Sequence, residues 1–496
     1  MRGMKKAGRC SAFVFALIFT ILIISQDCMA AELPYTTYNY DYWEDIIYTP
    51  AAYIPGDSVS GTSLSYKGEA IGAFSNPQDL CKSPEGDIFV ADTGNNRIVV
   101  LNQSMTEVKN IITGFDNHGK EDSFNAPYGV AVSEKNQLYI ADSQNKRIVV
   151  LNPDGSLEKI VANPKSEVLA DDFVFTPLKV SVDYADRIYC IAQKMFEGIM
   201  VFETNGEFTG FFGTINVEIT LWEKFWKKIA TKEERSKQQL YIPTEFTGID
   251  IDPDGFVYAS NIDSTGEQGV RRLNPKGQDV IKKGANKNVG GDLWIGGNTE
   301  YSGPSQFTDV VYRRNGIYSC LDRRRGRIFT YDHEGNLLYI FGGLGTQKGT
   351  FSMPVAIEDI GDKLVVLDAA RAEIAYFEVT EYGRLINEAV ALRFDGDEAQ
   401  AVELWKRVLE LDENNELANT GIGKAYLTAG DYENAMKYLE LGMSREYYSV
   451  AYKRYRNHIL TENASLVLTG IMFVIATMVI ISKVRKRRRK GGNQDA

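Results

Sequence analysis

One phrase recurs six times through the middle of this sequence, and this recurrence constrains the fold more than any other feature. Each copy contains a proline, a short alternating run, a turn and a second run. The first two copies are nearly identical, reading GDIFVADTGNNRIVVLN at 86–102 and NQLYIADSQNKRIVVLN at 136–152. Short Val, Ile, Tyr and Phe runs bounded by Gly, Asp and Asn predict strands joined by tight turns. The prolines that mark the copies are Pro77, Pro127, Pro177, Pro243, Pro304 and Pro354.

Repeats of this length with several strands apiece are typical of propeller blades. The copies resemble the NHL repeat family over residues 68–380. The resemblance and the six copies imply an all-β six-bladed propeller. The sixth copy lacks a fourth strand of its own, because helix-like sequence begins near Tyr382. We expect a strand at 57–64, within an N-terminal segment at 31–67, to complete this blade and cover its edges.

An Asp followed by an Arg recurs in the turn after the second strand of a copy, and in a propeller these turns lie on one face around the channel mouth. One hypothesis is a ring of acidic residues that binds a cation or a polar ligand. The alternative, which we favour, is that each Asp accepts N–H groups of its turn and pairs with its own Arg. The third and fourth copies carry Gln193 and Asn261 in place of Asp. The candidate binding face comprises Asp92, Arg97, Asp142, Arg147, Asp322, Arg327 and Asp368.

The third and fourth copies are separated by a longer segment, and its residues 216–240 have the pattern of an amphipathic helix. Trp222, Phe225 and Trp226 fall on one side of this helix, and lysines point elsewhere. Such a helix can lie in a membrane interface or dock on a partner. It can equally fold down on the propeller as a lid. Both interpretations add these three aromatic residues to the candidate binding face.

From residue 381 to residue 462 the hydrophobic period becomes helical. A shift of 34 residues aligns Ala389 with Gly423 and Ala401 with Ala435. This period resembles the tetratricopeptide repeat, and the segment holds two repeats plus one further helix. The resemblance implies either a peptide-binding groove or a rigid spacer. Because an independent solenoid needs three or more repeats, we expect these helices to lean on the propeller or the membrane.

The two ends of the chain are predicted to direct it to a membrane. Residues 1–30 combine basic residues, an apolar run and small residues before a cleavage position after Ala30, which indicates a signal peptide. An uncleaved signal anchor is the alternative. Residues 464–482 contain no charge and are long enough to span a bilayer. Seven basic residues in the tail at 483–496 predict that the tail is cytoplasmic. The expected location is therefore the plasma membrane, as a type I single-pass protein with most of the chain extracytoplasmic.

The few histidines and cysteines argue against several kinds of catalytic site. The three His residues are far apart in the repeat pattern, so no pair is expected to form a metal site or a catalytic triad. Cys81, Cys190 and Cys320 cannot all pair, so no disulfide framework is expected. The net charge of −11 disfavours nucleic acid as a partner and favours neutral or cationic ligands. The sequence predicts no cofactor and no bound metal.

These features predict a membrane-anchored extracytoplasmic binding or scaffold protein that is not an enzyme. The propeller and the tetratricopeptide-like helices would contact a protein partner or a small neutral or cationic ligand. Resemblance to proteins of this layout implies an envelope or transporter complex. The alternative is an extracytoplasmic propeller hydrolase or lyase, similar to lactonases, whose site the sequence does not reveal.

Overall fold

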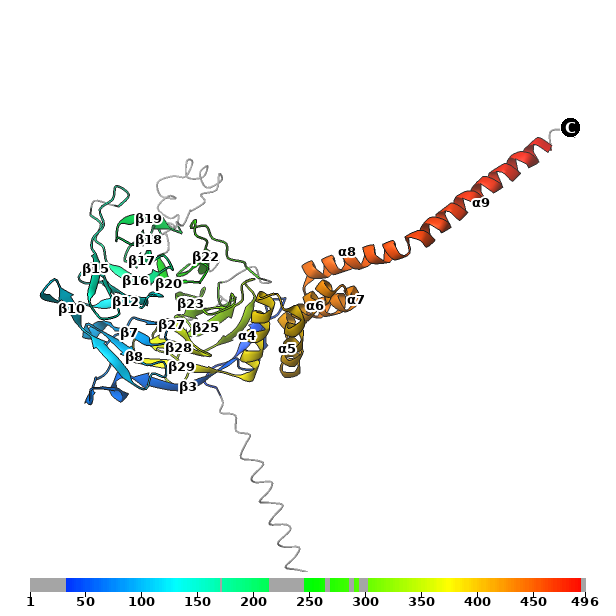
Figure 1. The fold of residues 1–496 in the computed structure, drawn as a ribbon. Coiled ribbons are helices and arrows are strands. Elements are labelled where there is room, and N and C mark those ends of the chain that lie inside the picture. The colour runs from blue at the N-terminus through cyan, green and yellow to red at the C-terminus, as the bar shows by residue number, and fades with distance from the viewer. Residues whose placement is uncertain are drawn as a thin grey trace, which may run out of the picture.

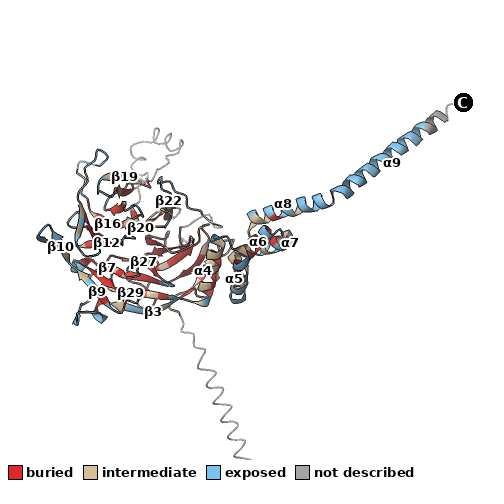
Figure 2. Ribbon diagram, in the orientation of Figure 1, coloured by how far each residue is buried: buried red, intermediate tan, exposed pale blue. Residues whose placement is uncertain are grey.

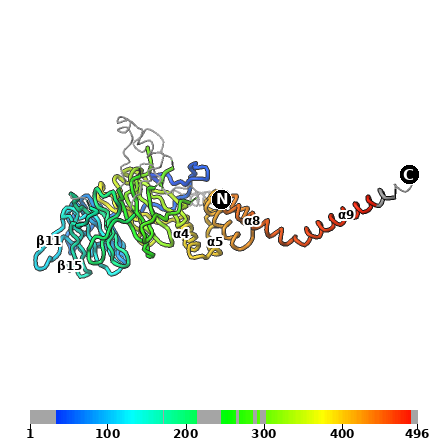
Figure 3. The backbone as a smooth tube through the Cα atoms, turned by 90° about the horizontal axis from the view of Figure 1, so that it is seen from above, coloured from blue at the N-terminus to red at the C-terminus, as the bar shows by residue number. Residues whose placement is uncertain are grey.

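A computed structural model describes residues 33–169, 172–213, 245–263, 268–284, 290–293 and 302–491 of the chain. This part of the chain forms six antiparallel blades followed by helices (Figure 1). The innermost strands of the blades contact one another in a closed ring. Viewed from above, the helices leave from one side of the propeller (Figure 3). The predicted fold class, a six-bladed all-β propeller followed by helices that include one long apolar helix, is confirmed.

The first three blades are four-stranded meanders whose strands pair in chain order from the innermost strand outward. Tight turns end in left-handed residues such as Asn96 and Lys146, which allow the chain to reverse between strands. Blade 1 contains β6 (Asp79–Lys82), β7 (Ile88–Asp92), β8 (Arg97–Leu101) and β9 (Val108–Ile112). Blade 2 contains β12 (Pro127–Val132), β13 (Leu138–Asp142), β14 (Arg147–Leu151) and β15 (Leu157–Val161). Blade 3 contains β16 (Pro177–Val182), β17 (Ile188–Ala192), β18 (Ile199–Phe202) and β19 (Phe208–Phe212).

The last three blades depart from this plan. Strands from the N-terminal segment join blades 5 and 6, and blade 4 has fewer described strands. Blade 4 has three described strands, β20 (Phe246–Ile251), β21 (Val257–Asn261) and β22 (Val270–Leu273). Blade 5 contains β23 (Phe307–Tyr312), β24 (Tyr318–Asp322), β25 (Arg327–Tyr331) and β26 (Leu337–Phe341), followed outward by β1 (Tyr38–Tyr40) and β2 (Ile46–Tyr48). Blade 6 contains β27 (Pro354–Ile360), β28 (Lys363–Asp368), β29 (Glu373–Val379) and β3 (Tyr53–Ser60). Two small hairpins, β4 (Ser65–Tyr66) with β5 (Glu69–Ala70) and β10 (Gly114–Asn117) with β11 (Lys120–Ser123), project between blades.

The strand that completes blade 6 comes from the N-terminal segment, and it lies earlier than the expected 57–64. It is β3, which pairs antiparallel with β29 from Tyr53 opposite Val379 to Ser60 opposite Glu373. The strand ends at Ser60 because residues 61–63 turn into a short 3-10 helix. A Cβ on Gly61 would overlap the carbonyl oxygen of Gly72. Only glycine therefore fits at the residue that follows the strand.

Six helices follow the propeller in the described part of the chain. Side chains at four N-caps, Thr380, Asp397, Asn415 and Asp431, accept a hydrogen bond from the first turn of the helix that follows, which satisfies N–H groups that the helix leaves unpaired. Small residues sit where helices cross, because a Cβ on Gly421 would overlap the Trp405 indole. The helices are α4 (Glu381–Phe394), α5 (Glu398–Leu411), α6 (Glu416–Ala429), α7 (Tyr432–Leu441), α8 (Arg445–Glu462) and α9 (Ala464–Gly491).

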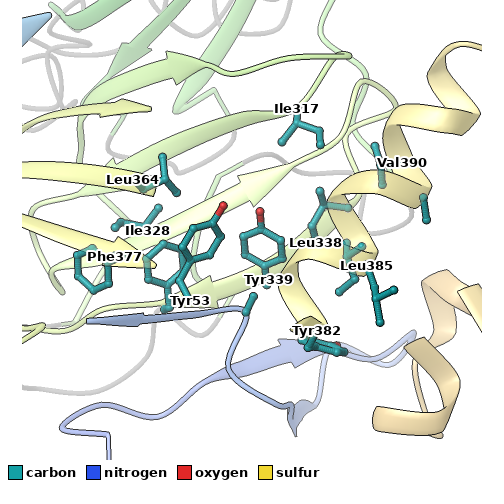
Figure 4. Packing of buried hydrophobic residues seen from close by; sticks show 14 of the residues in the cluster. Tyr53, Ile317, Ile328, Leu338, Tyr339, Leu364, Phe377, Tyr382, Leu385 and Val390 are labelled. Carbon is teal, nitrogen blue, oxygen red and sulfur yellow. The ribbon is translucent and has the colours of Figure 1, made fainter. Parts of the chain in front are cut away.

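Helix α4 packs directly on blades 5 and 6. Tyr382, Leu385 and Val390 of α4 belong to the same buried cluster as Tyr53 of β3 and Tyr339 of β26 (Figure 4). A hydrogen bond of 2.7 Å from the Tyr339 hydroxyl to the Asn387 amide oxygen satisfies a polar pair inside this cluster. The propeller and the first helix therefore share one hydrophobic core.

Helix α9 is exposed from Ala464 to Lys486, in contrast to the buried strands of the propeller (Figure 2). Its stretch Ala464–Lys486 is long and apolar enough to cross a membrane. At about 1.5 Å per residue, this stretch exceeds the hydrocarbon thickness of about 30 Å.

Tyr53 of β3 packs in the buried cluster that blades 5 and 6 share. We therefore expect Tyr53→Ala to lower the free energy of unfolding by about 3–5 kcal/mol. Tyr53 is fully buried, its ring stacks on Phe341 with ring centroids 4.9 Å apart, and its hydroxyl accepts a hydrogen bond from Arg313. Tyr184→Ala, at an exposed tyrosine, is the matched control and should change stability by less than about 0.5 kcal/mol. Urea denaturation of the detergent-solubilised chain checks this, and equal midpoints for both variants would contradict it.

Candidate binding site

The Asp residues of the first two copies are buried inside their own turns. Asp92 accepts hydrogen bonds from the Ser75 N–H at 2.7 Å, from Asn95 at 2.8 Å and from Arg97 Nε at 2.7 Å. Asp142 repeats this arrangement, with Arg147 Nε at 2.8 Å. Both Asp side chains are 0% exposed. In these two copies the structure shows the local pairing of Asp with its own Arg.

In the fifth and sixth copies the Asp residues are also buried, but their Arg partners differ. Asp322 accepts from the backbone N–H groups of Gln306 and Arg324, each at 2.9 Å. Arg327 turns away and bonds Asp292 at 2.8 Å. Asp368 accepts only backbone N–H groups among its described hydrogen bonds, which come from Ser352, Met353, Ala370 and Arg371.

The structure does not bring these Asp residues together, because each one stays in the turn of its own blade. Binding a ligand with them would break the hydrogen bonds that hold the turns. The aromatic residues Trp222, Phe225 and Trp226 lie outside the described residues. A binding role for this face therefore stays a prediction. At the equivalent position of blade 4, both amide atoms of Asn261 are buried without a hydrogen-bond partner.

Sequence reasoning missed a set of charged side chains on the innermost strands. Lys179 of β16 forms an ion pair with Asp79 of β6 and lies 3.5 Å from Asp309 of β23. All three side chains are buried. They occupy the same position in three copies of the recurring phrase, two residues after Pro77, Pro177 and Phe307, respectively. Alignment of the six copies at this position would have revealed the complementary charges.

Carboxylates on the innermost strands also join neighbouring blades. Each carboxylate accepts a hydrogen bond from a backbone N–H on the innermost strand of the following blade. This N–H lies on the inner edge of its sheet, where no further strand of the same blade can pair with it. The pairs are Asp79 with Val130 at 3.0 Å, Asp250 with Tyr312 at 2.7 Å, Asp309 with Ile357 at 3.0 Å and Glu358 with Lys82 at 3.3 Å.

Burial changes the protonation of these carboxylates. Burial raises the pKa of Asp250 to about 7, although its hydrogen bond from Tyr312 and the charge of Lys82 oppose the shift. Burial likewise raises the pKa of Glu358 to about 8 against the attraction of Lys82, which lies 3.2 Å away. The interior of the propeller therefore contains acids that release protons near neutral pH.

A cavity of about 530 Å³ lies between the propeller and the helices. Tyr40, Tyr42 and Ile47 line it from the N-terminal hairpin, and Leu417 and Lys424 of α6 line it from the helices. The β25–β26 turn and the start of α8 complete the wall, so segments far apart in sequence meet here. Further lining residues include Lys282, Glu334, Asn336, Asn415, Glu416, Arg445, Glu446 and Tyr447.

Glu334 holds the helices against the propeller at the cavity wall. It forms ion pairs with Arg393 of α4 and with Lys424 of α6, the latter at 2.9 Å. Burial alone would raise the pKa of Glu334, but the two cations outweigh burial and lower the pKa to about 2. The Lys424 ammonium also lies 4.0 Å from the centre of the Tyr447 ring. The wall therefore combines charged groups of both signs with aromatic surface, which suits a polar ligand.

The described residues contain no group of three or more His, Cys, Asp or Glu side chains placed to hold a metal ion. Cys81, Cys190 and Cys320 are free thiols.

Comparison with known proteins identifies one repeat. The family model described as NHL repeat matches residues 74–101, which supports the blade interpretation. Among solved structures, a streptogramin B lyase is 12% identical, with 67% of this chain and 100% of that chain covered and a TM-score of 0.40. A virginiamycin B lyase from Staphylococcus aureus is 10% identical over 65% and 99%, with a TM-score of 0.40. Kuenenia stuttgartiensis hydrazine synthase is 11% identical over 67% and 85%, with a TM-score of 0.40. No curated protein matches the chain.

The raised pKa values predict how stability depends on pH. The folded chain keeps protons on Asp250 and Glu358 that the unfolded chain loses above about pH 5, so their contribution is present in mild acid and disappears as pH rises through the folded pKa values. We expect the chain to lose stability between about pH 5 and about pH 8, by up to about 1.4 kcal/mol per pH unit for each proton that the folded chain retains and the unfolded chain has lost. Glu358→Gln should lose less over this range in urea denaturation, and the exposed control Glu378→Gln should follow the parent. Equal pH dependence in the two variants would contradict the assignment.

Removing Glu334 would leave the Lys424 side chain without its ion pair and Arg393 with only Glu398, 3.9 Å away. We expect Glu334→Ala to destabilise the junction by about 3–5 kcal/mol and to expose α4–α7 to limited proteolysis. Glu403→Ala, which removes an exposed pair with Lys406, should change the junction by less than about 1 kcal/mol. The same proteolysis rate in both variants would show that the ion pairs do not hold the helices.

Proposed function

We propose that this chain is a membrane-anchored extracytoplasmic protein that binds or assembles a partner at the junction of its propeller and its helices. The observation that carries the proposal is the cavity, because the N-terminal hairpin, blade 5 and helices α6 and α8 all contribute to it. A site built from both parts of the chain gives the helices a role in binding as well as in spacing.

The route to the membrane supports the same proposal. Helix α8 ends at Glu462 and α9 begins at Ala464, so the cavity lies on the segment that leads into the apolar helix. With a signal peptide at 1–30 and a basic tail at 483–496, the chain would be a type I single-pass protein of the plasma membrane. In this arrangement the propeller at 68–380 and the tetratricopeptide-like helices at 381–462 face outward, where an envelope or transporter complex is the proposed partner.

A hydrolase or lyase reaction has less support from the described side chains. A catalytic site needs groups that converge on open space and are free to exchange protons or hold a substrate. Lys179 is engaged by two carboxylates, and the carboxylates of the innermost strands hold the next blade through backbone hydrogen bonds. We therefore propose binding without catalysis.

Site-specific photo-crosslinking in intact cells tests the proposal. A photoreactive residue in place of Glu446, an exposed residue of the cavity wall, should give a discrete crosslinked species. The same residue in place of Glu121, an exposed residue of β11, which lies at the opposite end of the molecule from the helices (Figure 3), should give none. Protease added after removal of the cell wall should degrade the crosslinked species. Crosslinks absent at Glu446, equal at both positions, or protected from protease would contradict the proposal.

A further inference from the structure

The hairpin β1–β2 ends blade 5 in β2, a three-residue strand that carries no charge, Pro or Gly and has no further strand beside it in the described part of the chain. Natural edge strands carry charges, Pro or irregular residues that discourage another strand from pairing. The outermost strands β9 and β15 carry Lys109 and Lys159, and β3 carries Pro55 and Asp57. Strand β19 is interrupted by Gly210 in a left-handed conformation. Strand β2 has the sequence IIY, without charge, Pro or Gly.

Two residues of β2 direct their backbone groups outward. Two backbone hydrogen bonds show which residue pairs of the hairpin are hydrogen-bonded. They run from the Asp41 N–H to the Asp45 oxygen and from the Thr49 N–H to the Thr37 oxygen. Antiparallel pairs alternate between bonded and non-bonded, so Ile46, opposite Tyr40, is non-bonded. Tyr48, opposite Tyr38, is non-bonded for the same reason. Their N–H and C=O groups therefore point away from β1, toward the open edge.

The side chains beside this edge are apolar and exposed. Ile46 and Tyr48 are 49% and 78% exposed, and they share one face because they are two residues apart. Trp43, in the hairpin turn, is 65% exposed and packs edge-on against Tyr42 at 5.1 Å. Ile47, on the opposite face of the strand, lines the cavity. An added strand would cover this apolar surface and border the cavity.

The hairpin is held rigidly before any partner arrives. Tyr38 and Tyr40 both donate hydrogen bonds to Asp292, and Asn39 donates to the Leu337 oxygen at 3.3 Å. The Tyr42 N–H donates to Glu416 of α6 at 3.3 Å. An edge fixed by both the propeller and the helices needs little ordering on binding, which favours affinity.

Acidic residues beside β2 favour a partner segment that carries a basic residue. Asp41, Glu44 and Asp45 surround the hairpin turn at one end of β2, so a basic residue in the partner would lie beside them with favourable attraction.

We propose that β2 binds an extended segment of a partner protein by strand addition, with apolar residues at alternate positions and Lys or Arg at the end nearest the hairpin turn. This inference deepens the proposed function and rests on it, because the added strand would lie at the edge of the same cavity.

The test uses the full chain in nanodiscs and a fluorescein-labelled synthetic peptide, Lys-Lys-Thr-Val-Thr-Val-Thr. A peptide of the same composition with its two Val residues adjacent is the control. We expect the alternating peptide to bind at least tenfold more tightly, measured by fluorescence anisotropy. On binding, hydrogen exchange at the Ile46 and Tyr48 amides should slow, and exchange at the Ile47 amide should not change. Absent binding, or equal affinity for the two peptides, would overturn the proposal.

Two variants separate strand addition from other contacts. Ile46→Pro removes an outward N–H that β1 does not use, so the fold should persist while affinity falls at least tenfold. Ile46→Val keeps the N–H and should bind as the parent does, and equal melting temperatures show that both variants are folded. Equal affinity of the two variants would overturn the proposal. A dimer of the full chain that Ile46→Pro converts to a monomer would also overturn it, because the occupant would then be a second copy. Loss of peptide binding with retention of the Glu446 crosslink would reject this inference alone and leave the proposed function standing.

Discussion

The pairing of β3 with β29 is the constraint on which the rest of the described structure depends. It joins residues 53–60 to residues 373–379. A strand that precedes blade 1 in the sequence therefore completes blade 6. The residues just before β3 also hold the start of α4, whose N-cap is Thr380. The Thr380 hydroxyl donates to the Ala51 oxygen at 2.7 Å, and the Thr380 N–H donates to the Ala52 oxygen at 3.0 Å. Closure of the ring and the direction of α4 are therefore set by one strand.

The cavity follows from this closure. With α4 fixed on blades 5 and 6, Glu334 meets Arg393 and Lys424, and the N-terminal hairpin reaches α6 through Tyr42 and Glu416. Within a blade, backbone hydrogen bonds join neighbouring strands. Between blades, buried carboxylates of the innermost strands form the hydrogen bonds instead. They join blades through single N–H groups, at the cost of placing acids such as Glu358 where burial raises their pKa.

Local patterns in the sequence predicted most strands and helices, because alternating β-branched runs and the 34-residue helical period are strong signals over short distances. The predicted bounds of the closing strand, 57–64, were displaced from those of β3, since YIPGDSVSGTSL offers no clean alternation. The hairpin β1–β2 was missed because only blade 5 gives it a partner. Lys179 was missed because a lysine in a buried strand becomes favourable only when Asp79 and Asp309 arrive from other blades.

The coupling of closure to the helices can be tested at Gly383 of α4. A Cβ there would overlap the Ala52 carbonyl oxygen beside β3, whereas a Cβ on Gly470 of α9 would meet no atom within 4 Å. Both replacements by Ala favour the helix equally, so only the contact differs. The account predicts that hydrogen exchange of the β3 and α4 amides accelerates together in Gly383→Ala and stays unchanged in Gly470→Ala. Exchange that is unchanged in Gly383→Ala, or faster in α4 alone, would contradict it.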